Sequence, residues 1–263
     1  MNRIDWLQLG PQDGHGGAQG ETLNPIVGCT ANCKDPNGRP YCYARKMAPR
    51  TARFCDQRVE TGNRWVCGWD DAGPVVENAC ETFFPHFHPE RLEKLAHWKK
   101  PRRIFMDSMS DWWDPNVKQE WRDECYAAMA ANPQHRYLVL TKQPQNLSGW
   151  DGDDAWFWQN ECAWIGVTIE GLKQEMRQGQ VPEVRRFVSA EPLFEPFLIT
   201  GSVKWLILGA DSRRNPYLPG EEAFWEMIRQ ADDLRIPVFL KDNALKAYPN
   251  LPERREWPEG LLI

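Results

Sequence analysis

The chain has 263 residues, of which 41% are hydrophobic and 26% are charged, and its formal net charge is −5. These values are typical of a globular protein with one large domain or two small ones, and they argue against a generally basic nucleic-acid coat. We expect a cytoplasmic protein without a membrane partner, because no run of eighteen apolar residues predicts a span and the N-terminus lacks the apolar core of a signal peptide.

The first hundred residues carry few regular patterns. Residues 7–21 are rich in glycine and polar side chains, which is typical of a loop. We expect "NPIVG" at 24–28 to be the first strand and "KDPNGRP" at 34–40 to be a turn-rich insertion. Residues 49–85 show no clear period, so we predict an irregular excursion from the main fold there.

Six short apolar runs follow, and they predict strands that are covered on both faces, as in a parallel sheet. The runs are residues 103–108, 136–141, 163–168, 185–190, 203–209 and 236–241. Helix-like stretches at 116–132 and 220–234 lie between runs, so strand and helix alternate. We therefore predict one α/β domain over residues 1–263. It is a full or partial (β/α) barrel of six to seven parallel strands, with the irregular cysteine-containing insertion after the first strand.

Each apolar run ends in polar residues. The endings are residues 107–111, 141–144, 168–171, 189–192, 209–212 and 241–243. Functional groups collect at the carboxyl ends of strands in α/β folds, so six polar endings in succession predict a polar-lined cavity at one face. Helix N-caps demand the same residue types, and capping is the alternative interpretation.

Cys29, Cys33 and Cys42 follow the predicted first strand and therefore open onto the same face. In a reducing compartment, clustered cysteines more often bind metal or do chemistry than form disulfides. An iron–sulfur cluster held by three thiolates leaves one iron open, and that iron can chelate the amino and carboxylate groups of S-adenosylmethionine. A structural zinc ion needs four ligands, and the fourth would come from Cys55, Cys67, Cys80 or a histidine such as His86 or His88.

The triplet resembles the cysteine motif of the radical S-adenosylmethionine superfamily, in which three residues separate the first two cysteines and two separate the last two. Cys29 and Cys33 match the first spacing, and Tyr41 matches the aromatic residue that precedes the final cysteine and packs near the adenine. The gap of eight before Cys42 departs from the motif, and a turn at 34–40 that loops out and returns would explain it. The resemblance implies a catalytic [4Fe–4S] cluster on the three cysteines and an electron donor such as flavodoxin or ferredoxin.

Longer stretches, over roughly residues 22 to 212, resemble a phage- and prophage-encoded radical-SAM-like family of uncertain function. The stretches are "LNPIVGC", "CYARKMA", "FHPERLEKLAHWKKPRRIFMDSMSDWWDPNV", "LTKQPQNL", "IGVTIE", "FVSAEPL" and "LILGADS". This resemblance implies a phage protein that works in the cytoplasm of the host cell. It also favours a role in DNA modification.

The resemblance also implies where the cofactor binds, by strand order. The ending of the second strand would hold the methionine amino group, with Ser108, Ser110 and Asp111 as candidates, because a cationic amine needs acceptors. Thr168 and Glu170 would bond the ribose hydroxyls. The fifth and sixth endings would surround the adenine and the carboxylate, and their candidates are Ser189, Glu191, Gly209 and Asp211.

A second set of cysteines lies in the predicted excursion at positions 55, 67 and 80. These thiols could ligate an auxiliary cluster or, with His86 or His88, a zinc ion. An irregular segment with little periodic core often needs a metal to hold it. The alternative is that they are ordinary small buried residues.

Basic residues are concentrated at 39–53 and 97–103, next to the cysteine triplet and before the second strand. They favour a phosphate-bearing substrate, although a solvated basic face is the commoner outcome. Together with the family resemblance, they lead us to expect a nucleoside, nucleotide or nucleic-acid base as the substrate. Two other functions stay open. One is a zinc-stabilised, non-catalytic nucleic-acid-binding protein, and the other is a barrel hydrolase with Asp107, Asp111 and Glu191 around a divalent metal.

Overall fold

The structure is a computed structural model, and it describes residues 4–8, 20–52, 55, 59–61, 64–70, 73–77, 79–148, 152–183, 185–200 and 202–262. Within the three ranges between 59 and 77 it describes the backbone alone. No helix in these ranges is long and apolar enough to cross a membrane.

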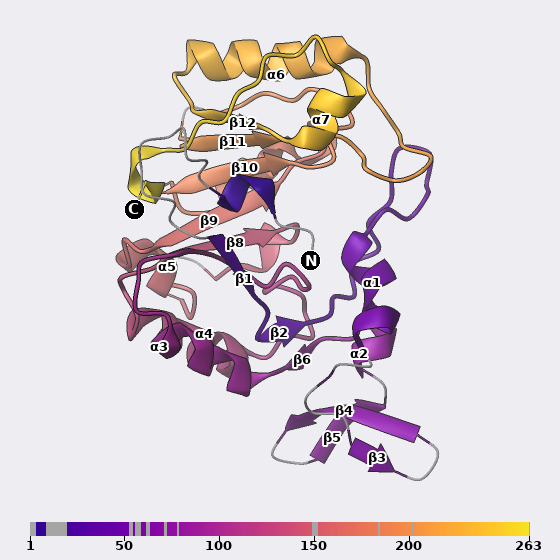
Figure 1. Cartoon of the computed structure of the whole chain (residues 1–263), viewed down its shortest axis with the longest axis vertical. Helices are drawn as coiled ribbons and strands as arrows, with labels where there is room; N and C mark the ends of the chain where they lie inside the picture. The colour runs from indigo at the N-terminus through magenta and orange to yellow at the C-terminus, as the bar shows by residue number, and fades with distance from the viewer. Residues whose placement is uncertain are drawn as a thin grey trace.

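Seven parallel strands form one sheet that curves into a half-barrel (Figure 1). Their order in space is their order along the chain: β1 (Gly20–Leu23), β7 (Arg103–Met106), β8 (Arg136–Thr141), β9 (Ala163–Thr168), β10 (Arg186–Ala190), β11 (Trp205–Leu208) and β12 (Val238–Leu240). Because β1 and β12 are the two edges of the sheet, the barrel is partial. The predicted α/β fold and the six apolar strands are confirmed.

The first strand of the sheet is not the predicted one. β1 overlaps the end of the predicted loop 7–21, whose residues 9–19 lie outside the described part of the chain. The segment "NPIVG" instead forms β2 (Ile26–Val27), which pairs antiparallel with β6 (His86–Phe87). The prediction was wrong because β1 is an edge strand without an apolar run; its Glu21 is half-buried and pairs with Arg102.

The α-helices are α1 (Tyr43–Thr51), α2 (Ala79–Thr82), α3 (Glu93–His97), α4 (Gln119–Ala130), α5 (Trp156–Gln159), α6 (Glu221–Asp233) and α7 (Asp242–Ala247). Five 3-10 turns accompany them: η1 (Asp5–Leu7), η4 (Pro89–Leu92), η5 (Pro144–Asn146), η6 (Leu172–Gln180) and η7 (Glu259–Leu261). α4 and α6 confirm the two predicted helices. Each buries one stripe of apolar side chains against the sheet, as a helix with polar residues on its other side must.

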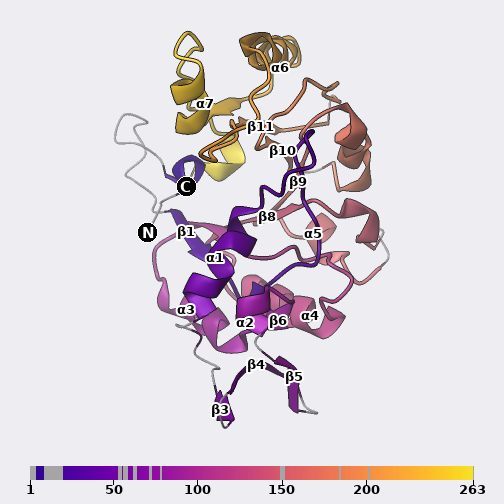
Figure 2. The same cartoon turned by 90° about the vertical axis from the view of Figure 1, so that its right-hand side faces the viewer.

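The excursion at 49–85 is regular, contrary to the prediction. It contains β3 (Val59–Thr61), β4 (Arg64–Asp70) and β5 (Gly73–Glu77), which pair as a three-stranded antiparallel sheet. The strands are short and lie outside the main sheet, so the sequence has no long hydrophobic pattern that would predict them. β4 contacts α2 and β6, and Figures 1 and 2 show this small sheet at one end of the molecule, away from α6.

Large aromatic side chains fill the concave face of the half-barrel. Trp6 from η1 contacts the rings of Phe105 and Trp205, with centroids 5.0 and 5.8 Å apart. Phe187 joins this cluster, and Gly166 makes room for it, because a Cβ there would lie 2.3 Å from the Phe187 ring. The concave face is therefore a packed core at this level, as expected for a barrel interior.

The same alternation of side chains continues toward the carboxyl ends of the strands, where the concave face becomes polar. Ser189, Gly209 and Lys241 each lie two residues beyond a member of this cluster, namely Phe187, Ile207 and Phe239. Thr168 lies two residues beyond Gly166 in the same way. A Cβ on Gly209 would come within 3.1 Å of both the Glu191 and the Lys241 side chains, so these groups from three strands meet there. The predicted polar endings thus lie at one edge of the sheet.

Candidate active site

The insertion at 34–40 folds as a closed turn. Lys34 and Pro40 form an antiparallel bridge, and the Asp35 side chain accepts hydrogen bonds of 2.9 Å from the backbone of Asn37 and Arg39. Gly38 has a φ of +75°, which the turn requires and which glycine adopts without strain. The Tyr41 amide then donates to the Cys33 carbonyl at 3.3 Å, so Tyr41 and Cys42 return to Cys33.

The backbone directly before Cys29 packs closely against neighbouring backbone. Gly28 has a φ of +98°, and a Cβ there would lie 2.2 Å from the Phe84 carbonyl oxygen. The Gly28 amide donates to the Met109 carbonyl and the Cys29 amide to the Phe83 carbonyl. The chain is therefore clamped between the end of β7 and the end of the excursion, directly before the first thiol.

Polar side chains fix the two ends of the cysteine loop, which we define as residues 29–42. Asp114 accepts hydrogen bonds from the Thr30 amide at 2.6 Å and from its hydroxyl at 2.7 Å. Arg45 of α1 donates to the Cys29 carbonyl at 2.6 Å and to the Ala31 carbonyl at 3.2 Å. Cys42 caps α1, because its sulfur accepts from the Arg45 amide at 3.4 Å. The loop is thus held to β7 and to α1.

The three thiols are half-buried and neighbour one another electrostatically, because Cys33 raises the pKa of Cys29 and Cys42 raises the pKa of Cys33. Burial raises the pKa of Cys29, and the charge of Asp111 raises it further. Burial also raises the pKa of Cys33, while Lys142 opposes the shift. In the absence of a metal Cys29 and Cys33 are therefore protonated at neutral pH, and binding a metal would release their protons.

Tyr41, Lys142 and Glu170 form a polar cluster beside the thiols. The Lys142 ammonium lies 2.5 Å from the Glu170 carboxylate, 3.1 Å from the Tyr41 hydroxyl and 5.2 Å from the Tyr41 ring centroid. The Tyr41 hydroxyl also donates to Glu170. Burial raises the pKa of Glu170 to about 7 and lowers that of Lys142 to about 8. This cluster can therefore exchange a proton near neutral pH.

The three candidates for the methionine amino group differ in their partners. The Ser108 hydroxyl donates to Asn24 at 3.2 Å. Asp111 accepts from the Thr141 hydroxyl at 2.6 Å and from the Lys142 amide at 2.8 Å, so much of its capacity is taken up within the chain. The Ser110 hydroxyl is buried without a hydrogen-bond partner. Ser110 is thus the member of this set with a polar atom left to satisfy.

The candidates from the later strands divide between two ion-pair groups. Glu191 pairs with Lys241 at 2.5 Å. Asp211 pairs with Arg213 at 2.5 Å, and Arg213 also reaches Asp35 in the cysteine loop at 2.5 Å. Of the three remaining candidates, Thr168 and Ser189 are buried neighbours in β9 and β10, and Gly209 lies against the Glu191 and Lys241 side chains.

The second cysteine set packs more closely than the first. In the described part of the chain, Cys55, Cys80 and His88 are the group whose potential metal-binding atoms all lie within 4.8 Å of one another, and all three residues are buried. The Cys67 side chain lies outside the described residues. The cysteine triplet does not form such a group, so the structure gives no support for a single zinc ion bound there.

The hydrolase alternative also lacks its metal site. Asp107 accepts from the Ile26 amide at 2.9 Å and from the Trp112 indole, and Glu191 faces Lys241 instead. Among the described residues, Asp107, Asp111 and Glu191 do not come together as a group of ligands. A divalent metal held by these three carboxylates is therefore not the chemistry of this site.

Three charged residues at the site had no predicted role, namely Lys142, Asp35 and Arg213. Lys142 follows β8 directly, and its place in a polar strand ending was a usable signal. Asp35 looked like an ordinary turn residue, and Arg213 had no motif. Their pairing closes a distance of 178 residues along the chain, which no local pattern reports.

The fold and the site define the class: a half-barrel α/β protein with a three-thiol loop at the carboxyl ends of its strands. Residues 18–246 match the family described as "Protein of unknown function (DUF5131)", and the chain belongs to that family. No curated protein matches the sequence.

The chain is also similar to a solved structure of a spore photoproduct lyase mutant with bound AdoMet and a dinucleoside spore photoproduct. The TM-score is 0.44 and the sequence identity is 11%. The alignment covers 94% of this chain and 65% of that chain, so this chain spans less than two thirds of its length.

Proposed function

We propose that the protein is a radical S-adenosylmethionine enzyme whose cysteine loop holds a [4Fe–4S] cluster through Cys29, Cys33 and Cys42. The observation that carries this proposal is the closed turn at 34–40. It returns the chain so that Tyr41 and Cys42 lie next to Cys33, although eight residues separate the two cysteines. A turn of this kind would let Cys42 act as the third ligand despite the longer spacing.

The donor set fits such a cluster. Three half-buried thiols lie on one loop, and they are not gathered tightly enough for a single ion. A cluster spreads its ligands over several irons, which suits a wider spacing. The chain itself fixes this loop through Asp114 and Arg45. When bound, the cluster would supply the electron that cleaves S-adenosylmethionine to a 5′-deoxyadenosyl radical.

Other residues at the strand ends would bind and orient S-adenosylmethionine. The Ser110 hydroxyl, which lacks a partner, and the buried Asp111 carboxylate are acceptors for the methionine amino group. Tyr41 would lie against the adenine, and Glu170, held by Lys142, would accept from a ribose hydroxyl. Thr168, Ser189, Glu191, Gly209 and Asp211 complete the proposed cofactor-binding set.

The proposed substrate is a nucleoside, nucleotide or nucleic-acid base. Lys46 and Arg50 give α1 an exposed basic side, one turn and two turns beyond Cys42, and such a side suits a phosphate. A flavodoxin or ferredoxin would provide the electron. Phage origin, a role in DNA modification and the choice among isomerase, lyase and base-modifying outcomes stay predictions.

Purification without oxygen tests the proposal. We expect brown protein with about four irons per chain, and cleavage of S-adenosylmethionine once a reductant is added. Cys29→Ala should lose the iron and the cleavage together. Cys162→Ala, which removes a buried thiol elsewhere, should keep both.

Cleavage retained by Cys29→Ala would contradict the assignment. Colourless protein that contains zinc and binds DNA with a steep dependence on salt would favour the non-catalytic nucleic-acid-binding alternative instead.

A further inference from the structure

We propose that Cys55, Cys80, His86 and His88 bind a structural zinc ion that fastens the three-stranded sheet β3–β5 to the half-barrel. We call these four residues the Cys/His group. The site is separate from the cysteine loop, and the proposal holds whether or not the loop carries a cluster.

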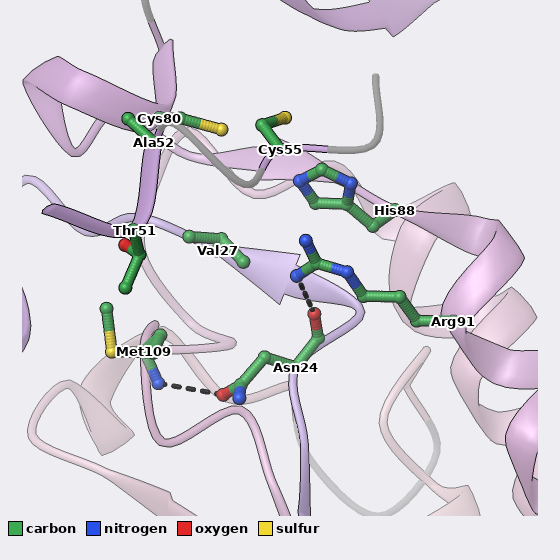
Figure 3. Close-up of a pocket in the computed structure, with 9 residues that line it drawn as sticks. All are labelled: Asn24, Val27, Thr51, Ala52, Cys55, Cys80, His88, Arg91 and Met109. Carbon is green, nitrogen blue, oxygen red and sulfur yellow. Dashed lines mark hydrogen bonds between the residues drawn. The ribbon is translucent and has the colours of Figure 1, made fainter. Parts of the chain in front are cut away.

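The first argument is the spatial arrangement of the donors. Cys55, Cys80 and His88 place their donor atoms within 4.8 Å of one another, and Figure 3 shows the two thiols and the imidazole converging on one cavity of about 160 Å³. The fourth donor, His86 Nε2, lies 2.9 Å from Cys80 Sγ. Ligands of a tetrahedral zinc ion lie roughly 3.3–3.8 Å apart, given bonds of about 2.0–2.3 Å. Small side-chain movements would therefore close the shell.

The second argument is the orientation of both imidazoles. His86 Nδ1 lies 2.7 Å from the Phe84 carbonyl oxygen, and His88 Nδ1 lies 3.0 Å from a Glu90 carboxylate oxygen. If each Nδ1 donates its proton to that oxygen, each Nε2 keeps a lone pair that faces the thiols. Zinc-bound histidines use this same arrangement, with a carbonyl or carboxylate behind the ring.

The third argument is an unsatisfied atom. His88 is fully buried, and its Nε2 has no hydrogen-bond partner. A buried polar atom without a partner is unfavourable, so native structures rarely leave one. A metal ion in the cavity would satisfy it. A hydrogen-bonded Cys80–His86 pair would explain that contact without a metal, but it leaves His88 unexplained.

The fourth argument is the place of the group in the fold. Cys55 precedes β3, Cys80 lies in α2 after β5, and the histidines belong to β6 and its end. The group therefore joins both ends of the excursion. Among the described residues, the buried core at this point consists of Cys55, Ala79 and Cys80. A small buried cluster of this kind is one that a metal can stabilise.

The chemistry of the donors selects the metal. Two thiolates with two neutral imidazoles are a common structural zinc set and suit zinc better than magnesium or calcium, which prefer oxygen. Four protein donors would complete a tetrahedral shell and leave no position for a substrate. The inference is therefore a structural ion and not a second catalytic centre.

The test uses the full chain in which Cys29→Ala, Cys33→Ala and Cys42→Ala are combined, so that no metal can bind the cysteine loop. This protein is stripped of metal and supplied with Zn²⁺ alone, or with Co²⁺ as a spectroscopic substitute. We expect about one zinc ion per chain and a cobalt spectrum with tetrahedral bands and thiolate charge transfer. Chelation should lower the melting temperature.

Three further substitutions in this background sharpen the result. His88→Ala should weaken zinc binding at least about 100-fold, because removing a mere orienting partner of a ligand already costs 10–100-fold. His88→Cys should keep the metal and strengthen the thiolate charge-transfer band of bound cobalt. His135→Ala, at a buried histidine outside the group, should keep zinc even where it lowers stability.

Three results would overturn the proposal. The first is no uptake of zinc or cobalt by the parent protein. The second is equal affinity in His88→Ala, and the third is a Cys55–Cys80 disulfide in protein purified without oxygen. Iron content and cleavage of S-adenosylmethionine, measured on the chain with its loop cysteines intact, report separately on the proposed enzyme, so either proposal can fail alone.

Discussion

The cysteine loop and the Cys/His group use the same side chain in opposite surroundings. The loop thiols are half-buried, stand at the carboxyl ends of the sheet and neighbour the charged residues Asp111, Lys142 and Glu170. Cys55 and Cys80 are buried, lie within 4.8 Å of an imidazole and border an apolar cluster. Access and neighbouring charge suit the first set to bind a reactive group, while close packing suits the second to hold the fold.

The two regions also differ in what keeps their shape. The loop is fixed by hydrogen bonds and ion pairs to the strand ends, above all through Arg213 and Asp114. Around the Cys/His group, the described hydrogen bonds orient the two imidazoles, and the proposed zinc ion would join them to the thiols. A substitution in the Arg213 ion-pair network should therefore disturb the cysteine loop alone. A substitution of a residue that hydrogen-bonds a proposed zinc ligand should lower the zinc affinity alone.

The largest expected effect comes from Arg213→Met. Arg213 bonds both oxygens of the buried Asp211 carboxylate and also reaches Asp35, with 14% of its own side chain exposed. Bonds to charged groups contribute about 1.5–3 kcal/mol, so we expect the free energy of unfolding to fall by about 2 kcal/mol. Denaturant titration measures the change, and the zinc content should stay the same.

Arg254→Met is the matched control for this prediction. Arg254 forms the same forked contacts with Asp232 and Glu256, but these carboxylates are 53% and 41% exposed. Surface ion pairs contribute about 0–1 kcal/mol. An equal loss in both variants would mean that the Arg213 network does not hold the loop.

The loss in Arg213→Met should depend on pH. Burial alone would raise the pKa of Asp211, but hydrogen bonds from Arg213 and from the Tyr217 amide lower it below its ordinary value. A carboxyl group with a lowered pKa stabilises the fold above about pH 4 and loses that contribution as the pH falls through its folded pKa. The difference between the two proteins should thus be full at pH 7 and shrink below pH 4.

The sequence predicted the part of the fold in which strands alternate with helical segments. Strands β7 to β12 are apolar on both faces, so each was visible as a short hydrophobic run between helical segments. β1 was missed because an edge strand with a half-buried Glu21 has no such run. The sheet β3–β5 was missed because its short strands have little apolar pattern and stand apart from the main core.

The candidate site also has a part that the sequence predicts and a part that it does not. The positions of Tyr41 and of the strand-end candidates can be predicted from their order along the chain, because parallel strands bring their ends to one edge. The side-chain contacts among these residues cannot be predicted in this way. Lys142 meets Tyr41 across 101 residues and Arg213 meets Asp35 across 178, so both contacts depend on how far the sheet curves.

A smaller effect is expected from Glu90→Gln, and it should appear at the metal. Glu90 accepts a hydrogen bond behind His88 and is 39% exposed. Loss of such a partner costs 10–100-fold in metal affinity, and exposure places Glu90 at the lower end, so we expect about 10-fold weaker zinc binding. Competition with a chelator measures it. Glu93→Gln, at an exposed position on the same segment, should leave the affinity unchanged, and unchanged iron content in Glu90→Gln would keep the two regions independent.

The smallest expected effect tests whether the two hydrogen bonds of Arg45 matter to the loop. Its Nη2 atom donates to the carbonyls of both Cys29 and Ala31, and a lysine ammonium lacks the planar guanidinium that fixes both donor directions. Because Arg45 is exposed, Arg45→Lys should change the free energy of unfolding by less than about 1 kcal/mol. The cluster should still form, but its iron should leave about 2–5-fold faster into a chelator without oxygen, since 1.4 kcal/mol corresponds to a factor of ten. Arg50→Lys on the same helix is the control. If both variants lose iron at the wild-type rate, α1 does not hold the first thiol in place, and Asp114 with the closed turn must be enough to do so.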